Sequence, residues 1–322
     1  MEQNELENLK KKVSEKKKNL GEYIVNPKVT LIMQFFNHEY LISQHTERIK
    51  KNKLIEEVII CEDGSSDNSL NLWHKKLTRR NDIIIRTSDY HEIYSYNRAA
   101  RYANGEYLVF CQDDDLLPAN DYWLKNAIKL FETDKKLGLI GLISGDLFKN
   151  NDSINHFRRA KKYNWYGTQK LLGVSGNPIK KSLSDIQFMY LSAVIIGPVI
   201  IKKELFHKLG EWNSNLSKAG LCGIGLDWDL SFRCWNEGYN VGCMPLEIKT
   251  KEEIKNDILE DKYFYYRYGF RGTCNFGIES RGEQYKENLQ KIKQKINSFG
   301  PQFLKDIYDK INLLNNNLKT IN

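Results

Sequence analysis

The sequence has 322 residues and a formal net charge of +8, which allows one large domain with additions or two domains. Its longest apolar stretch, residues 193–201, is far shorter than the ~20 residues that a membrane-spanning helix needs. The lysines are spread among acidic residues and the N-terminus is polar, which argues against nucleic-acid binding and against a signal peptide. We therefore expect a cytoplasmic protein without a transmembrane segment, and peripheral contact with a membrane stays open.

The six cysteines contain no CxxC pair, and several stand in apolar, strand-like sequence. This pattern predicts reduced, mostly buried thiols and argues against structural zinc. The residues are Cys61, Cys111, Cys222, Cys234, Cys243 and Cys274.

The first 27 residues form a lysine-rich leader, expected to be a solvated helix or a frayed end over residues 1–20, with no assigned chemistry. Apolar runs of strand length then alternate with runs of helix length. The predicted strands are Val29–Phe36, Glu57–Cys61, Ile83–Arg86 and Glu106–Gln112, and the helices between them are Glu39–Lys51, Asn68–Leu77 and Ile93–Ala103. This alternation predicts βαβ units and an α/β domain with a parallel sheet and right-handed crossovers.

The later elements are less regular. A long segment, Phe148–Leu183, is rich in asparagine, glycine and aromatic residues, and such segments are usually functional or mobile. The other predicted elements are helix Tyr122–Thr133, strand Gly138–Ser144, strand Val194–Ile201, helix Lys203–Leu209, loop Gly210–Gly225, helix Asp227–Glu237 and strand Tyr239–Met244. We expect a main domain over residues 28–250 and a helical C-terminal extension over residues 251–322.

The run Tyr107–Cys111 reads as a strand buried on both faces, and it stops at three consecutive carboxylates, Asp113, Asp114 and Asp115. Ligands bind at the carboxyl ends of strands in open α/β sheets, and crowded carboxylates need a cation or hydrogen bonds to offset their repulsion. We favour a divalent metal that holds a phosphorylated ligand. The alternative is a turn in which one aspartate caps the next helix.

The turn after the second strand places Glu62 and Asp63 at the carboxyl end of that strand. Gly64 allows a tight turn, and Asp67 is in position to cap the next helix. A carboxylate at this position can accept a hydrogen bond from the N–H of a nucleotide base. Phe36, at the end of the first strand, could stack on that base. In the alternative, both acids only form the turn and Phe36 belongs to the core.

Four motifs in this order carry a family resemblance: VTLIMQFFN, EDGSSDNS, NRAARYANGEYLVFCQDDDLLP and GLDWDLSFRCWNEGY. Together they resemble the family 2 glycosyltransferases of the GT-A fold, over about Lys28 to Leu246. The resemblance implies a Rossmann-like sheet and inverting transfer of a sugar from a nucleotide-sugar donor, with UDP favoured, to a hydroxyl of a glycan or other acceptor. It also implies a divalent cofactor, Mn²⁺ or Mg²⁺.

The resemblance assigns roles to individual residues. Asp227 matches the catalytic base and Asp114 the metal ligand. The positions matched to donor binding are Phe36, Asp63, Asn97, Arg98, Gln112 and Asp113. Asp229 stands two residues after Asp227, about 200° further around a helix, so we expect it to hold the helix or a neighbouring backbone.

Several positions depart from the family pattern. Gln112 replaces the first acid of D-x-D, Leu226 replaces a glutamate before Asp227, and Tyr96 replaces an arginine. The sequence LEIKTKEE occupies the position where many family members carry a metal-binding histidine. The metal could therefore have fewer protein ligands here, with Lys249 or Lys251 supplying positive charge. The aromatic segment at 163–166 and the Gly210–Gly225 loop are candidates for the acceptor wall.

Two other classes stay open on these residues. A nucleotidyltransferase would normally carry a glycine-rich phosphate loop after its first strand, and FFNHEY is not one. A non-catalytic protein that binds carbohydrate or nucleotide is compatible with the changes at Gln112 and Leu226. A processive membrane-embedded synthase is disfavoured, because the sequence has no QxxRW motif.

Overall fold

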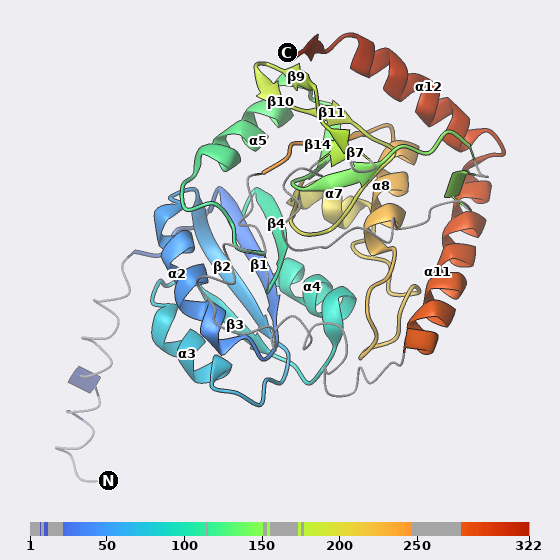
Figure 1. The fold of residues 1–322 in the computed structure, drawn as a ribbon. Helices are drawn as coiled ribbons and strands as arrows, with labels where there is room; N and C mark the ends of the chain where they lie inside the picture. Colours follow the sequence, from blue (N-terminus) through green and yellow to red (C-terminus); the bar gives the residue numbers. More distant parts are fainter. Residues whose placement is uncertain are drawn as a thin grey trace.

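The computed structural model describes residues 22–113, 115–150, 153–154, 173–174, 177–246 and 278–321, together with residues 7, 10 and 11. Within this part, eight strands form a central sheet in the order β11-β14-β5-β13-β4-β1-β2-β3 (Figure 1). The strands are β1 (Val29–Phe35), β2 (Ile55–Glu62), β3 (Ile83–Arg86), β4 (Tyr107–Gln112), β5 (Leu137–Gly141), β11 (Met189–Tyr190), β13 (Val199–Lys202) and β14 (Asn240–Cys243).

The sheet is mostly parallel, as predicted. β1 pairs in parallel with both β2 and β4, β2 pairs with β3, and β5 pairs with β14. β13 runs antiparallel between β4 and β5, and β11 runs antiparallel to β14. Because β13 reverses direction, its first residues lie at the same end of the sheet as the last residues of β4.

Helices pack against this sheet. α4 lies against β1 and β2, α5 against β5, and α8 against β5 and β14 (Figure 1). The described helices of the main domain are the 3₁₀ turn η1 (Glu39–Leu41), α2 (Ile42–Lys51), α3 (Ser69–Lys76), α4 (His91–Tyr102), α5 (Tyr122–Thr133), α7 (Lys203–Lys208) and α8 (Leu226–Asn236). None of the described helices is long and apolar enough to cross a membrane.

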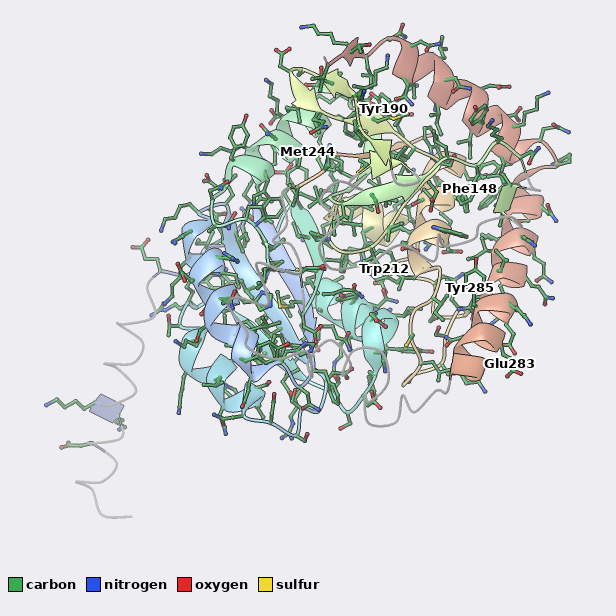
Figure 2. The ribbon with its side chains drawn as sticks, viewed as in Figure 1. Phe148, Tyr190, Trp212, Met244, Glu283 and Tyr285 are labelled. Atoms are coloured by element: carbon green, nitrogen blue, oxygen red, sulfur yellow. The ribbon has the colours of Figure 1, made fainter. Side chains whose placement is uncertain are left out.

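The core follows the sequence pattern. Every residue of β1 is buried, as is typical of a strand covered on both faces. α5 buries Trp123, Leu124, Ala127 and Phe131, whose spacing of three to four residues makes one apolar face. Trp212, labelled in Figure 2, is buried among Tyr96, Phe110 and Phe206.

Two predicted strands are each divided in the structure. The run predicted as Val194–Ile201 forms β12 (Ala193–Val194) and β13, because Gly197 has φ +129° and Pro198 has no N–H to donate. The run predicted as Gly138–Ser144 ends β5 at Gly141, and β6 (Ser144–Asp146) joins a second sheet.

The described residues also form two smaller sheets. β12 pairs with β6, and β6 continues to β7 (Gly173–Val174) and β8 (Asn177–Pro178). The other sheet joins β9 (Lys181–Leu183), β10 (Ile186–Gln187) and β15 (Lys319–Thr320), so the C-terminus pairs with a strand near the middle of the chain.

The C-terminal helices α11 (Ile278–Phe299) and α12 (Phe303–Asn316) pack into the same hydrophobic core as the sheet. Their buried members include Ile292 and Ile311. Asn315 on α12 both accepts from Tyr190 N (2.9 Å) and donates to Tyr190 O (3.0 Å) on β11. The predicted boundary near residue 250 lies outside the described residues, and the division into domains stays a prediction.

The described cysteines are free thiols, as predicted, and Cys222 is the one among them that is not fully buried. Burial raises the pKa of Cys61, Cys234 and Cys243, which keeps these thiols protonated and unreactive at neutral pH. Cys274 lies outside the described residues.

Candidate active site

The candidate site lies at the carboxyl ends of β1, β2 and β4, beside the start of β13. The register places Gln34 of β1 opposite Gln112 of β4, and Val199 of β13 opposite Phe110. In consequence the Gly197–Pro198 turn, which precedes β13, lies next to the acid cluster that follows β4.

Asp113 points toward the end of β1. Phe36 N donates a hydrogen bond to Asp113 Oδ2 at 3.0 Å, and His38 Nδ1 lies 3.1 Å from the same oxygen. His45 Nε2 donates to the Asp113 carbonyl oxygen at 2.8 Å. The Asp113 side chain is buried, so its carboxylate fixes the loop after β1. It is not presented to a nucleotide-sugar donor in this structure.

Asp115 lies beside Gly197. Its Oδ2 accepts from Gln112 N at 2.9 Å, and a Cβ added at residue 197 would stand 3.4–3.6 Å from both Asp115 oxygens and from Gln112 Oε1. Burial raises the pKa of Asp115 to about 7, the Gln112 N–H opposes this, and the charge of Asp113 adds to it. Three oxygens therefore converge where glycine leaves room.

Oxygen donors of this kind suit hard divalent cations such as Mg²⁺ and Mn²⁺, so the residues around Gly197 fit the metal that the family resemblance implies. The predicted ligand Asp114 lies outside the described residues, as do Lys249, Lys251 and the aromatic segment 163–166. Within the described ranges, no group of three or more His, Cys, Asp or Glu side chains forms a metal site.

Asp227 lies in the first turn of α8, after Gly225, whose φ of +80° turns the chain into the helix. Ile196 N donates to Asp227 Oδ2 at 2.9 Å, and Trp228 N donates to Asp227 Oδ1 at 2.9 Å. Ile196 precedes Gly197, so this bond brings Asp227 to the same corner as Gln112 and Asp115. The side chain is half-buried.

Asp229 holds α8 in place through contacts with neighbouring residues, as predicted. It is buried and accepts from Arg233 Nε at 2.7 Å, and from Asn213 Nδ2 at 3.1 Å. Arg233 also donates to the Leu209 carbonyl oxygen. The pair therefore ties α8 to the loop that follows α7.

Asp63 is fully buried, and the protein supplies four donors to its carboxylate. These donors are Gln34 Nε2 (2.6 Å), Thr87 Oγ1 (2.6 Å), Tyr90 N (2.7 Å) and His91 N (2.9 Å). A carboxylate has about four acceptor positions, so none is presented to a nucleotide base in this structure. This geometry favours the alternative in which Asp63 forms the turn and holds the start of α4.

Comparison with known families identifies the chain. The profile of glycosyl transferase family 2 matches residues 30–196, just over half of the sequence. The chain belongs to glycosyl transferase family 2. The match covers the first three sequence motifs from Thr30 onward and ends at Ile196, before the Gly197 turn and Asp227.

A curated relative is the UDP-Glc:alpha-D-GlcNAc-diphosphoundecaprenol beta-1,3-glucosyltransferase WfgD of Escherichia coli, 25% identical over 153 residues. The match covers 45% of this chain and 56% of that protein, so this family 2 chain aligns with little more than half of its relative. Among solved structures, GalNAc-T7 with UDP, GalNAc and Mn²⁺ superposes with a TM-score of 0.51 at 13% identity, over 90% of this chain and 58% of the other. The GT-A fold is thereby confirmed.

Asn97, one of the positions matched to donor binding, has a structural partner in this structure. Asn97 is buried, donates to Trp212 O at 2.8 Å and accepts from Trp212 N at 2.9 Å, so its amide joins α4 to the loop after α7. Arg98 is exposed on α4. Tyr96, in place of the family arginine, donates to Cys111 O at 2.9 Å and packs on Phe110. Phe36 is buried, as its core alternative expects.

The sequence reasoning missed several supporting residues. His38 and His45 hold Asp113, and Gln34 and Thr87 hold Asp63. Polar side chains in apolar strands, such as Gln34 in VTLIMQFF, were the available signal, because a buried amide needs a partner.

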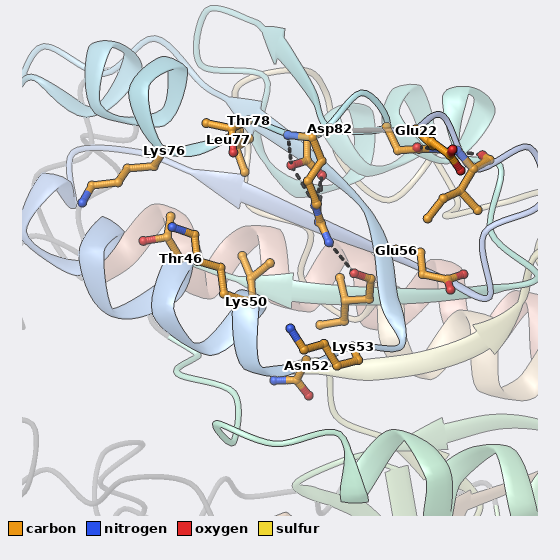
Figure 3. Close-up of a pocket in the computed structure, with 15 residues that line it drawn as sticks. Glu22, Thr46, Lys50, Asn52, Lys53, Glu56, Lys76, Leu77, Thr78 and Asp82 are labelled. Atoms are coloured by element: carbon orange, nitrogen blue, oxygen red, sulfur yellow. Dashed lines mark hydrogen bonds and ion pairs between the residues drawn. The ribbon is translucent and has the colours of Figure 1, made fainter. Parts of the chain in front are cut away.

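A cavity of about 580 Å³ lies away from this site, at the amino ends of β2 and β3 (Figure 3). Lys50, Lys53 and Lys76 border it, while Arg79 is paired with Asp82 at 2.8 Å. It contains none of the predicted site residues.

Proposed function

We propose that this chain is an inverting glycosyltransferase that moves a sugar from a nucleoside diphosphate to a hydroxyl of a glycan or other acceptor. The observation that carries the proposal is the bond from Ile196 N to Asp227, which brings a half-buried carboxylate to the corner formed by Gln112, Asp115 and Gly197. Membership of family 2 supports the reaction class.

In the proposed step, Asp227 accepts the proton of the acceptor hydroxyl while the hydroxyl oxygen bonds to the anomeric carbon. The bond from that carbon to the diphosphate oxygen breaks, and the nucleoside diphosphate leaves with the electron pair. A positioned base contributes typically 10²–10⁴ in rate. Attack from the face opposite the leaving group inverts the anomeric configuration.

Asp114, together with Asp115 and Gln112, would hold a divalent metal. When bound, such a metal offsets the charge that develops on the departing diphosphate. WfgD is named for UDP-Glc, and the GalNAc-T7 structure contains UDP and Mn²⁺. These names support a UDP-sugar donor and Mn²⁺ or Mg²⁺ for this chain, with a sugar hydroxyl as acceptor, and we place the reaction in the cytoplasm.

The first experiment screens nucleotide sugars for thermal stabilisation and for hydrolysis, with Mn²⁺, with Mg²⁺ and with chelator. A donor at 100 times its dissociation constant should add about 2.7 kcal/mol to the free energy of unfolding. Binding and hydrolysis that need the metal support the proposal. Binding without any hydrolysis or transfer would instead support a non-catalytic binding protein.

The second experiment compares Asp227→Asn with Asp229→Asn. Asp227→Asn should keep donor affinity near that of wild type and lower the transfer rate by ~10² or more, because it removes the proton acceptor without removing volume. Asp229→Asn should act on stability, since it leaves the largely buried Arg233 side chain without its charge partner, a loss of roughly 3 kcal/mol. Transfer at the wild-type rate by Asp227→Asn, or product NMR showing retention, would contradict the assignment.

A further inference from the structure

The loop between α7 and α8 connects the start of α4 with the start of α8, where Asp227 lies. Gly223 N donates to Glu92 Oε2 at 3.1 Å, and Gly220 N donates to Tyr90 O at 3.4 Å. Tyr90 N in turn donates to Asp63, at the end of β2. On its other side the loop runs into α8 and Asp227, so its shape couples the start of α4 to the start of α8.

The C-terminal helix α11 contacts this loop along one face. Gln284 Nε2 donates to Ser217 Oγ (2.8 Å) and to Cys222 O (2.7 Å), and Asn288 Nδ2 donates to Ile224 O (2.9 Å). Gln284, Asn288 and Ile292 follow one another at four-residue intervals, which places them on the same side of the helix. The two amides are 8% and 1% exposed.

The third member of this face meets the entry to α8. A Cβ added at Gly225 would stand 2.7 Å from Ile292 Cδ1, so α11 packs directly on the left-handed residue that begins α8. Asp227 follows two residues later. A small shift of α11 would therefore move Ile224 and Gly225, and with them the Asp227 carboxylate.

The two amides carry a cost in stability. The carbonyl oxygens of Gln284 and Asn288 are buried and accept no hydrogen bond from the described residues. A buried polar atom without a partner is unfavourable, and an apolar side chain of similar size is the ordinary occupant of such a position. We therefore attribute the burial of these two amides to their hydrogen bonds with the loop, and not to a gain in the stability of the core.

We propose that Gln284 and Asn288 are positioning residues for sugar transfer: α11 holds the 213–225 loop so that Asp227 meets the acceptor hydroxyl. The inference rests on the function proposed above, and it gives the C-terminal helices a part in the reaction. It concerns the placement of Asp227 against the acceptor and not the binding of the donor, because α11 contacts the loop and α8, not β1 or β4.

The test uses the full chain and two variants that keep volume and remove the amide, Gln284→Met and Asn288→Leu. The matched control is Gln290→Met, since Gln290 is exposed on another face of α11. Three quantities are measured: hydrogen exchange of the 213–229 amides, donor affinity by calorimetry with the donor found in the nucleotide-sugar screen, and the rates of transfer and of donor hydrolysis.

We expect faster exchange confined to the 213–229 amides, unchanged donor affinity, and a transfer rate lowered about tenfold or more, since small misplacement of a reacting group is costly. The melting temperature should stay close to that of wild type, because an unfavourable buried amide is also removed. The control should match wild type in every measurement.

Unchanged exchange and transfer in both variants would overturn the proposal. A lowered melting temperature with faster exchange throughout the sheet and weaker donor binding would also overturn it, in favour of a purely structural role. If wild type moves sugar from none of the donors, the proposed function fails, and the exchange measurement still decides whether the amides hold the loop.

Discussion

Asp63 offers a test at the scale of a single residue. Its carboxylate accepts four hydrogen bonds from the protein, two of them from backbone N–H groups at the start of α4. Asp63→Ala should lower the free energy of unfolding by about 3 kcal/mol or more, because several buried donors lose their acceptor.

Urea denaturation measures this change, and the exposed Asp309→Ala serves as control, expected within about 0.5 kcal/mol of wild type. A fully stable Asp63→Ala variant that binds nucleotide weakly would restore the base-reading hypothesis.

His45 makes stability depend on pH. Burial lowers the pKa of His45 from 6.5 to about 4, although the hydrogen bond to the Asp113 carbonyl oxygen and the charge of Asp113 oppose the shift. The unfolded chain therefore takes up a proton as the pH falls below about 6.5, while the folded chain resists it. The stabilisation from His45 is complete above that pH and is lost as the pH falls toward 4.

The expected loss between pH 7.5 and pH 5 is about 2 kcal/mol. Urea denaturation at both values measures it, with His45→Gln as the comparison, because glutamine does not titrate. A decline of equal size in His45→Gln would show that other groups cause the pH dependence.

Asp229 and Asp63 show how much of the environment of a single residue can be predicted from the sequence. The structural role of Asp229 was predictable, because helix geometry separates it from Asp227 and its partner Arg233 stands one turn further on. The environment of Asp63 was not, since its partners come from β1 and from the turn before α4, and no spacing along the chain reveals them.

At the scale of elements, the strands and helices between residues 29 and 112 were predicted to within two residues. Continuous apolar runs, each bounded by polar turns, specify such strands clearly. The direction of β13 was not predictable, because it depends on the course of the chain through residues 142–198. The turn at Gly197 and Pro198 was visible in the sequence but was included in the predicted strand.

Gly225 provides a prediction for the start of α8. Gly225 has φ +80°, and Gly238, just beyond the other end of the helix, has φ +81°. A Cβ at Gly225 would stand 2.7 Å from Ile292 Cδ1, whereas one at Gly238 would meet nothing within 4 Å. Both alanine variants should lose about 1 kcal/mol from backbone strain.

Gly225→Ala should lose more than this and should also lower the transfer rate, since the buried Ile292 side chain must shift to make room for the added methyl group. Chemical denaturation and transfer assays of the two variants side by side separate strain from crowding. Equal effects of the two substitutions would contradict the contact with Ile292.

At the scale of the whole molecule, α12 is expected to be indispensable. It buries Leu304, Ile307 and Ile311 in the main core, and the strand after it pairs with β9. Deletion of residues 303–322 should abolish cooperative unfolding and yield aggregated protein, because apolar surface is exposed. Size-exclusion chromatography and thermal denaturation measure this, with deletion of Asn322 alone as control. A monomeric, cooperatively folded deletion variant would contradict the expectation.

The bond between Asn315 and Tyr190 has a consequence for self-association. β11 is the outermost strand on its side of the sheet, and the outward N–H and C=O of Tyr190 are the groups that another chain could use to add a strand. The Asn315 amide presents one donor and one acceptor to them, as a neighbouring peptide unit would. The Asn315 side chain thus takes the hydrogen-bonding groups of Tyr190 that a ninth strand would use, while Phe188 N beside it donates to Lys181 O of β9, and loss of α12 would leave the Tyr190 groups without this cover.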